Sequence, residues 1–252
     1  MPFTEVGGKT IFFSHSTSES DRNLLLIHGS GGDHMHWPYQ LRRLPGINVC
    51  AVDLPGHGKS GGHGHNNVED YADFINSFVS ELNFDKVSLA GHSLGGAIVQ
   101  CLALRSPKWL SRIILVGTGA RLRVAPAILE GILSDFQGTT DLICNEYAYG
   151  PAASPSLIDA GRKALSKVHP PLLLGDYTAC DQFDVMEKIK GLTLPTSVIC
   201  GSADKLTPVK YSEYLHRHIR GSAISIIEGA GHMVGLEKHE EFTESIGRFL
   251  TN

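Results

Sequence analysis

KVSLAGHSLGGAIVQ, residues 86–100, is the stretch that decides the fold of this chain of 252 residues. Its first part is a short apolar run without alternation, which is typical of a strand covered on both faces. Its last part is helix-like, and Gly91 and Gly95 leave room for a sharp turn at Ser93. A strand, a strained one-residue turn and a helix expose the hydroxyl of the turn residue at the helix N-terminus. We therefore predict Ser93 as a nucleophile, the alternative being a helix N-cap.

The pattern G-x-S-x-G occurs twice, so the pattern alone does not identify the nucleophile. The second match is GKSGG, residues 58–62, with Ser60 at its centre. Ser60 follows PGHGK and precedes GGHGH, and neither glycine-rich piece has the composition of a strand or a helix. The flanking sequence therefore favours Ser93.

Further apolar runs indicate the rest of the sheet. Runs rich in Val, Ile and Leu end in Gly or Asp turns at residues 24–27, 48–52, 87–90, 113–116 and 196–200. Residues 10–13 predict an edge strand and residues 224–227 a last strand, with helix-like stretches such as 68–82 in between. Alternating strands and helices indicate a parallel sheet. We expect an α/β fold with a mostly parallel sheet of about eight strands, flanked by helices.

The alternation stops between residues 119 and 190, a segment far longer than an ordinary connection. Apolar residues at helical spacing in 128–136 and several later prolines predict short helices there. We interpret residues 119–190 as a helical cap inserted after the sixth strand. Residues 1–118 and 191–252 would then form the core, with one structural domain overall.

Composition excludes several classes of function. Lys and Arg number 22 against 26 Asp and Glu, so the net charge of −4 offers no basic field for nucleic acid. No segment has 18 consecutive apolar residues, and we expect no membrane span. The cysteines are odd in number and scattered, which suits a reducing compartment and predicts a cytoplasmic location; they are Cys50, Cys101, Cys144, Cys180 and Cys200.

A serine nucleophile needs a base, and His232 is the candidate. In this arrangement the order along the chain is serine, acid, histidine, so the base must follow Ser93. His232 lies in EGAGH, a flexible loop after the last strand signal, whereas the segments around His216, His218 and His239 are helix-like. Imidazole is suited to the role because its pKa lies near neutral pH. The alternative is a turn histidine without a partner.

The acid should follow a strand between Ser93 and His232. CGSADKLTP supplies Asp204 directly after the strand at 196–200, whereas Asp181 and Asp184 precede that strand. An ionised aspartate would select the histidine tautomer that leaves Nε2 free to accept the serine proton. The alternative for Asp204 is a capping role before the helix that follows.

Two backbone N–H groups are candidates for an oxyanion hole. The N–H of Leu94 lies at a helix start and faces the position where negative charge develops. The second should come from the HGSGG loop after the strand at 24–27, where we choose the N–H of Ser30. The alternative for this loop is an ordinary glycine-rich turn.

Taken together, the chain resembles the α/β-hydrolase family, and most of all its small serine esterases with a helical cap. The resemblance rests on five segments in the family's order, namely LLLIHGSGG, VDLPGHGKS, GHSLGG, CGSADKLTP and EGAGHM. It implies hydrolysis of a small to medium carboxylic ester through an acyl-enzyme, without a cofactor. The alternatives are a C–C bond hydrolase, a hydroxynitrile-lyase-like enzyme, and a ligand receptor with slow turnover. The partner would be a small-molecule ester, and the oligomeric state stays open.

Several other motifs have a structural explanation as well as a functional one. VDLPGHGKS resembles a phosphate-binding loop, but Asp53 stands where that motif requires glycine. The scattered histidines lack the cysteine or carboxylate spacing of a metal site, so we predict no metal. Arg121 and Arg123 could meet an anionic group or simply be solvated. An apolar acyl pocket is predicted from aromatic residues, each of which could equally be packing; they are Trp37, Phe136, Tyr147 and Tyr149.

Overall fold

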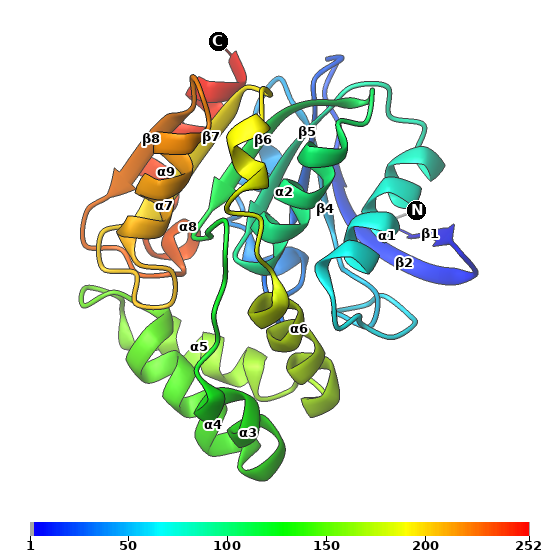
Figure 1. Cartoon of the computed structure of the whole chain (residues 1–252). Coiled ribbons are helices and arrows are strands. Elements are labelled where there is room, and N and C mark those ends of the chain that lie inside the picture. The colour runs from blue at the N-terminus through cyan, green and yellow to red at the C-terminus, as the bar shows by residue number, and fades with distance from the viewer. Residues whose placement is uncertain (1–2, 252) are drawn as a thin grey trace.

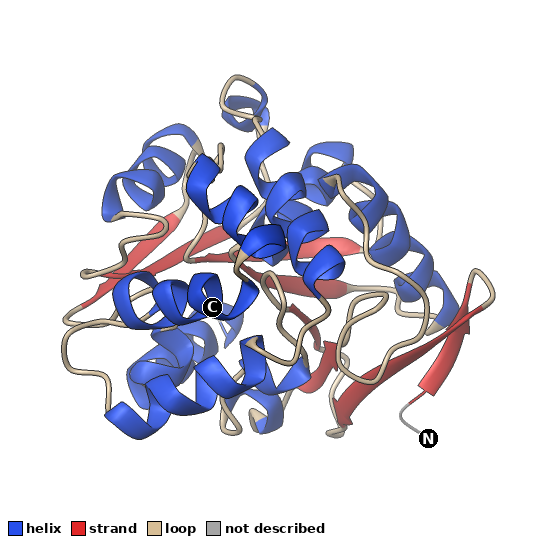
Figure 2. Cartoon of the chain, turned by 90° about the horizontal axis from the view of Figure 1, so that it is seen from below, coloured by secondary structure: helices blue, strands red, loops and turns tan. Residues whose placement is uncertain are grey.

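The computed structural model describes residues 3–251, which form an eight-stranded sheet with helices on both sides (Figures 1 and 2). The strand order is β1-β2-β4-β3-β5-β6-β7-β8. Strand β2 pairs antiparallel with β1 and β4, and all the remaining neighbouring strands pair in parallel. The expected mostly parallel α/β sheet is therefore confirmed. The strands are β1 (Phe3–Val6), β2 (Lys9–Ser16), β3 (Asn23–Ile27), β4 (Asn48–Val52), β5 (Val87–His92), β6 (Leu110–Val116), β7 (Thr196–Gly201) and β8 (Ala223–Ile227).

One strand differs from the expectation. The run at 10–13 was predicted as an edge strand, but β2 is paired on both sides and β1 forms the edge. Strand β1 buries only Val6, so it lacks the apolar signal of the inner strands. The turn that joins β1 to β2 contains Gly7 and Gly8, and both adopt the positive φ that tight hairpin turns require.

Both faces of the sheet are buried, which explains why the strand runs lack alternation. Leu25 and Ile27 of β3 point to the face covered by α1 (Val68–Glu81), α2 (Leu94–Arg105) and α7 (Val209–His218). Leu24 and Leu26 point to the opposite face, which α8 (Val234–Glu237) and α9 (His239–Thr251) cover. Two short 3₁₀ helices, His34–His36 and Leu41–Arg43, complete the second face. Parallel strands buried in this way read as continuous hydrophobic runs.

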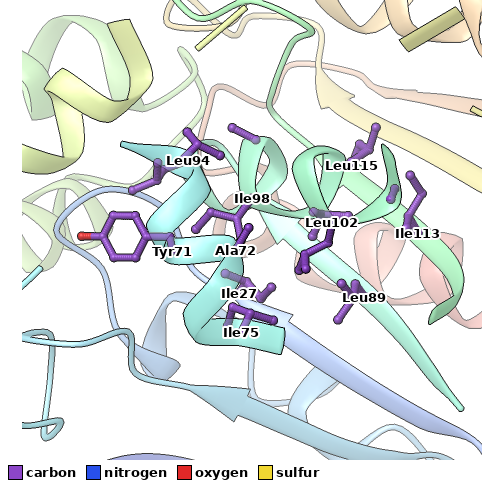
Figure 3. Packing of buried hydrophobic residues seen from close by; sticks show 14 of the residues in the cluster. Ile27, Tyr71, Ala72, Ile75, Leu89, Leu94, Ile98, Leu102, Ile113 and Leu115 are labelled. Carbon is purple, nitrogen blue, oxygen red and sulfur yellow. The ribbon is translucent and has the colours of Figure 1, made fainter. Parts of the chain in front are cut away.

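Packing of α1 and α2 on the sheet fixes the start of α2. Figure 3 shows Ile98 and Leu102 of α2 among side chains of α1 and the strands, including Ile75 and Leu89. All four are fully or almost fully buried. Each such side chain contributes about 1.5–3 kcal/mol relative to exposure. The residue at the junction of β5 and α2, Ser93, is thereby held by the core on both sides.

The segment between β6 and β7 is helical and lies at one end of the sheet (Figure 1). The periodic run at 128–136 forms two helices rather than one, because Asp135 interrupts it and caps the second by accepting from Gly138 N at 3.0 Å. This segment has a hydrophobic cluster of its own, centred on Ile132 and Leu173. Its elements are α3 (Pro126–Ser134), α4 (Phe136–Leu142), the π-helix Ile143–Ala148, α5 (Pro155–Leu165), α6 (Pro170–Gln182) and the 3₁₀ helix Lys188–Gly191.

Two further expectations concern membrane-spanning helices and the cysteines. Within residues 3–251, no helix combines the length and apolar character needed to cross a membrane. All five cysteines, which lie in the same range, are free thiols.

Candidate active site

Ser93 occupies the turn between β5 and α2 in a strained conformation. Its φ of 53° and ψ of −115° lie outside the regions that residues with a side chain ordinarily adopt, at a cost of about 1–3 kcal/mol. Its glycine neighbours make the turn possible. A Cβ on Gly91 would lie 2.1 Å from the carbonyl oxygen of Gly95, and one on Gly95 would lie 2.1 Å from that of Ile27. The geometry is that of a strand–nucleophile–helix elbow.

His232 and Asp204 are brought together from two different loops. His232 follows β8, Asp204 follows β7, and Nδ1 of the imidazole lies 2.9 Å from Oδ2 of the carboxylate. Because an ionised carboxylate only accepts, Nδ1 carries the hydrogen and Nε2 is left free to take a proton. Within residues 3–251 no hydrogen bond joins Ser93 to His232.

The neighbourhood of Asp204 favours its ionised form. Oδ1 accepts from the backbone N–H groups of Leu206 and Thr207 at 2.9 and 2.8 Å, and Oδ2 accepts from the Thr207 hydroxyl at 2.8 Å. Burial acts to raise the pKa of Asp204, but His232 and the Thr207 donors outweigh it, so the pKa lies below its ordinary value. Asp204 therefore orients His232 and also closes its own turn. Sequence reasoning missed Thr207, although an aspartate bonding to N–H groups just ahead is a known turn signal.

Two more histidines, His92 and His36, hold His232 in position, and the sequence did not identify them as site residues. His92 Nε2 lies 2.9 Å from the carbonyl oxygen of His232, so it must donate. Its Nδ1 then accepts from His36 Nε2 at 2.7 Å. Burial, reinforced by the nearby His232, lowers the pKa of His92 to about 3, which keeps this ring neutral. The backbone of His232 is thus held by the residue that directly precedes Ser93, and the two rings are 4.6 Å apart.

The loop after β3 lies against Ser93. A Cβ on Gly29 would come within 3.1 Å of the Ser93 Cβ. Among residues 3–251, the N–H groups of Ser30 and Leu94 donate to no backbone carbonyl. The N–H of the next residue, Gly31, is already taken by Asp176 of α6 at 2.8 Å. The N–H groups of Ser30 and Leu94 are therefore free of backbone acceptors, and they stay the predicted donors of an oxyanion hole.

Of the four aromatic candidates for an acyl pocket, Trp37 lies apart from the other three. Trp37 is buried in the core and stacks on Phe242 of α9, with ring centroids 6.3 Å apart. Phe136 and Tyr149 belong to the hydrophobic cluster of the inserted segment, and Tyr147 is half-buried on the π-helix. Packing accounts for the positions of Trp37 and Tyr149.

Arg121 and Arg123, at the start of the inserted segment, form half-exposed ion pairs. Each has a guanidinium nitrogen 3.8 Å from Oδ2 of Asp184. Ion pairs of this exposure contribute little to stability. Their pairing with Asp184 favours the solvated interpretation.

The second G-x-S-x-G match has a structural role. The hydroxyl of Ser60 donates to the carbonyl of Asp53 at 2.7 Å and accepts from Phe12 N at 2.9 Å. Within residues 3–251, Asp33, His34 and Asp53 form a group whose possible ligand atoms lie within 4.8 Å of one another. Both Asp53 oxygens already accept from protein, Oδ1 from His34 and Oδ2 from Lys59 N. These donors account for the buried carboxylate without an ion.

A strained strand–turn–helix elbow at Ser93, a buried histidine–aspartate pair and a helical insertion after β6 define the class of α/β-fold hydrolases. The chain belongs to the alpha/beta hydrolase family, whose model matches residues 24–245. It is 28% identical over 242 residues to a pimeloyl-[acyl-carrier protein] methyl ester esterase of Neisseria meningitidis, covering 90% of this chain and 93% of that protein.

Two further similarities point the same way. A 3-oxoadipate enol-lactonase of Acinetobacter baylyi is 23% identical over 252 residues, covering 96% of this chain and 94% of that protein. The solved structure of a thermophilic esterase is 38% identical, with a TM-score of 0.89 and coverage of 99% of this chain and 96% of that chain. The family expected from the sequence is thus confirmed, and the proteins that this chain is similar to include esterases.

Proposed function

We propose that the chain is a serine carboxylesterase that cleaves a small to medium ester through an acyl-enzyme. The observation that carries the proposal is the buried 2.9 Å hydrogen bond between Asp204 and His232, placed beside the strained elbow of Ser93. Esterases and an enol-lactonase among the similar proteins support it, because a lactone is a cyclic ester.

The chemistry follows from the roles of these groups. Nε2 of His232 takes the hydroxyl proton as Ser93 Oγ attacks the ester carbonyl carbon, and the N–H groups of Ser30 and Leu94 stabilise the oxyanion. The C–O bond then breaks, and the imidazolium gives its proton to the leaving alkoxide. Water, activated by the same imidazole, attacks the acyl group and frees Ser93. Asp204 keeps the required tautomer throughout.

Replacement of the nucleophile tests the proposal. In Ser93→Ala we expect kcat for p-nitrophenyl acetate to fall by about 10³-fold or more with the melting temperature retained, because loss of a triad member removes the attacking group. Ser60→Ala is the matched control, since that hydroxyl only bridges Asp53 and Phe12. Labelling by a fluorophosphonate should add one group at Ser93, located by mass spectrometry. Loss of activity in Ser60→Ala but not in Ser93→Ala would refute the assignment.

An ester panel graded by acyl length would define the substrate class. The competing functions predict other outcomes. A C–C bond hydrolase would prefer a vinylogous diketone to any ester of the panel, and a lyase would prefer a cyanohydrin. A receptor would bind one small molecule tightly with negligible turnover.

A further inference from the structure

Helix α6 of the cap presents one face to the loop that carries Ser30. Leu173, Asp176 and Cys180 are spaced by three and four residues, so they share this face. Asp176 accepts from the N–H of Gly31 at 2.8 Å, and the sulfur of Cys180 lies 3.7 Å from the Ser30 hydroxyl oxygen. A Cβ on Gly31 would lie 2.8 Å from Leu173 Cδ1, which shows how closely helix and loop approach.

Asp176 is a buried carboxylate with donors from three separate elements. It is 0% exposed and accepts from Gly31 N at 2.8 Å, His57 Nε2 at 2.9 Å and the Tyr71 hydroxyl at 2.6 Å. The donors come from the loop after β3, the loop after β4 and helix α1. Figure 3 shows the Tyr71 hydroxyl pointing away from the hydrophobic cluster around Ile98. Burial of an ionised group is tolerated only with such partners, so the site is built around the carboxylate.

His57 supplies the compensating charge. Its Nδ1 lies 3.1 Å from the carbonyl oxygen of Pro55 and its Nε2 lies 2.9 Å from Asp176. Both neighbours are acceptors, so both ring nitrogens carry hydrogen, which is the imidazolium form. Burial opposes that charge, but the charge and hydrogen bond of Asp176 outweigh it, and the pKa of His57 is raised. The VDLPGHGKS segment therefore contributes a buried ion pair with the cap.

The loop held by Asp176 is a tight turn. Gly32 N donates to Gly29 O at 3.0 Å, which places Ser30 and Gly31 at the two central positions. Gly31 has a φ of +64°, and in such turns the orientation of the central peptide separates one turn type from another. The N–H of Gly31 belongs to that central peptide, so Asp176 fixes its orientation.

We propose that Asp176 is a positioning residue that holds the Ser30 N–H in place from the cap, so that the oxyanion hole is complete only while α6 is docked on the core. This inference rests on the proposed esterase function. It makes cap docking a condition for turnover, because the same helix that closes over the loop also orders the donor.

Graded replacement of Asp176 tests this role. In Asp176→Ala the Gly31 N–H loses its acceptor, and we expect kcat to fall about 10- to 100-fold, less than removal of a whole oxyanion donor costs. KM should change by no more than about twofold, since a transition-state interaction is lost. Binding of an alkyl trifluoromethyl ketone, which adds to serine as an oxyanion, should weaken by the same factor as kcat/KM.

Asp176→Asn is the conservative variant. Its side-chain oxygen can still accept from Gly31, but a neutral acceptor is weaker than a carboxylate. We expect a fall in kcat of only about 3- to 10-fold, between the native protein and Asp176→Ala. If the alanine variant does not fold, the asparagine variant carries the test alone. Unchanged kcat in a folded variant of either kind would overturn the proposal.

Asp181→Asn is the matched control, because Asp181 lies on the same helix and accepts from Val124 N at 3.0 Å, away from the oxyanion loop. We expect its kcat to match that of the native protein. An equal loss in this control would mean that any weakening of α6 lowers the rate, which would contradict a specific role for Asp176.

A readout without catalysis separates this inference from the proposed function. Hydrogen exchange at the Gly31 amide, followed by NMR, should accelerate in both Asp176 variants and not in Asp181→Asn. If Gly31 exchanges faster in the Asp176 variants but the native protein cleaves no ester, the role of Asp176 in holding Gly31 stands and the proposed esterase function is rejected. If the native protein is an active esterase but Asp176→Ala leaves the exchange of Gly31 unchanged, the esterase function stands and the role of Asp176 is rejected.

Discussion

At the scale of single residues, hydrogen-bond partners assign nearly every proton around the candidate base. Asp204 holds the hydrogen of His232 on Nδ1, and the His232 carbonyl holds that of His92 on Nε2. His36 must then donate to His92. None of these three rings has a choice of tautomer, so the site is organised before substrate arrives. Such preorganisation reduces the reorganisation needed at the moment of reaction.

The dependence of the rate on pH should isolate His232. We expect kcat/KM for p-nitrophenyl acetate to fall at acid pH, because a protonated imidazole cannot accept the proton of Ser93. His92 and His28 do not explain this limb, because burial above all lowers their pKa values to about 3 and about 4. Asp204 stays ionised, since its pKa is lowered. A flat profile down to about pH 4, in protein that circular dichroism shows to be folded, would contradict a histidine base.

Residues could be predicted from the sequence where the segments that flank them identify them. Ser93 could be proposed from its flanking strand and helix, and Asp204 and His232 from loops that follow strand signals. The catalytic roles of these three stay predictions. Asp176 could not be found in this way, because its three donors lie 105 to 145 positions earlier in the sequence. Only the folded chain brings them to one carboxylate.

At the scale of elements, the elbow depends on close backbone contact between β5, α2 and β3. We expect Gly95→Ala to destabilise the fold by about 3 kcal/mol or more, because overpacking against backbone has no side chain to rearrange. Its Cβ would lie 2.1 Å from the Ile27 carbonyl oxygen. The measurement is the free energy of unfolding in urea.

Gly247→Ala is the control for that experiment. Gly247 lies within α9, and a Cβ there would meet only Leu44 Cδ1, at 3.8 Å. Alanine is favoured over glycine in a helix by about 0.5–1 kcal/mol, so this variant should be slightly more stable than the native protein. Equal stability of Gly95→Ala and the native protein would show that β3 can withdraw from the elbow.

Elements with two buried faces were the most predictable. The inner strands reveal themselves by apolar runs, whereas β1 buries one residue of four and was missed. In the inserted segment, helical spacing was recognised but the break at Asp135 was not. The side chain of Asp135 caps α4, and this hydrogen bond competes with the continuation of α3. The spacing of the apolar residues does not reveal that competition.

At the scale of the whole molecule, the segment inserted between β6 and β7 is hydrogen-bonded to the rest of the chain on both sides of the candidate site. On one side Asp176 of α6 holds Gly31. On the other, Glu237 of α8 accepts from Gly150 N, at the end of the π-helix segment, and from Gly231 N, next to His232. The loop that carries Ser30 and the loop that carries His232 are thus each hydrogen-bonded to the inserted segment or to the helix that holds it. The insertion itself could be predicted from its length, but these ties join residues far apart in sequence.

The buried ion pair of His57 and Asp176 gives the fold a dependence on pH. His57 faces Asp176 of α6, with Tyr71 of α1, His28 after β3 and Asp53 after β4 as the other titratable groups around it. Its pKa is raised in the folded protein, so its stabilisation is fully present below the ordinary value of 6.5. That stabilisation is lost as pH rises through the raised value, by up to about 1.4 kcal/mol for each pH unit between the folded and unfolded pKa.

Replacement of His57 should therefore remove stability selectively on the acid side. We expect the difference in free energy of unfolding between the native protein and His57→Gln to shrink as pH rises from about 6 to about 9, because the native ion pair loses its positive partner. The exposed His63, in the same loop, provides the matched control through His63→Gln. A difference that stays constant over this range would mean that His57 is neutral in the folded chain. Asp176 would then hold Gly31 without a cationic partner, against the usual requirement that a buried charge be paired.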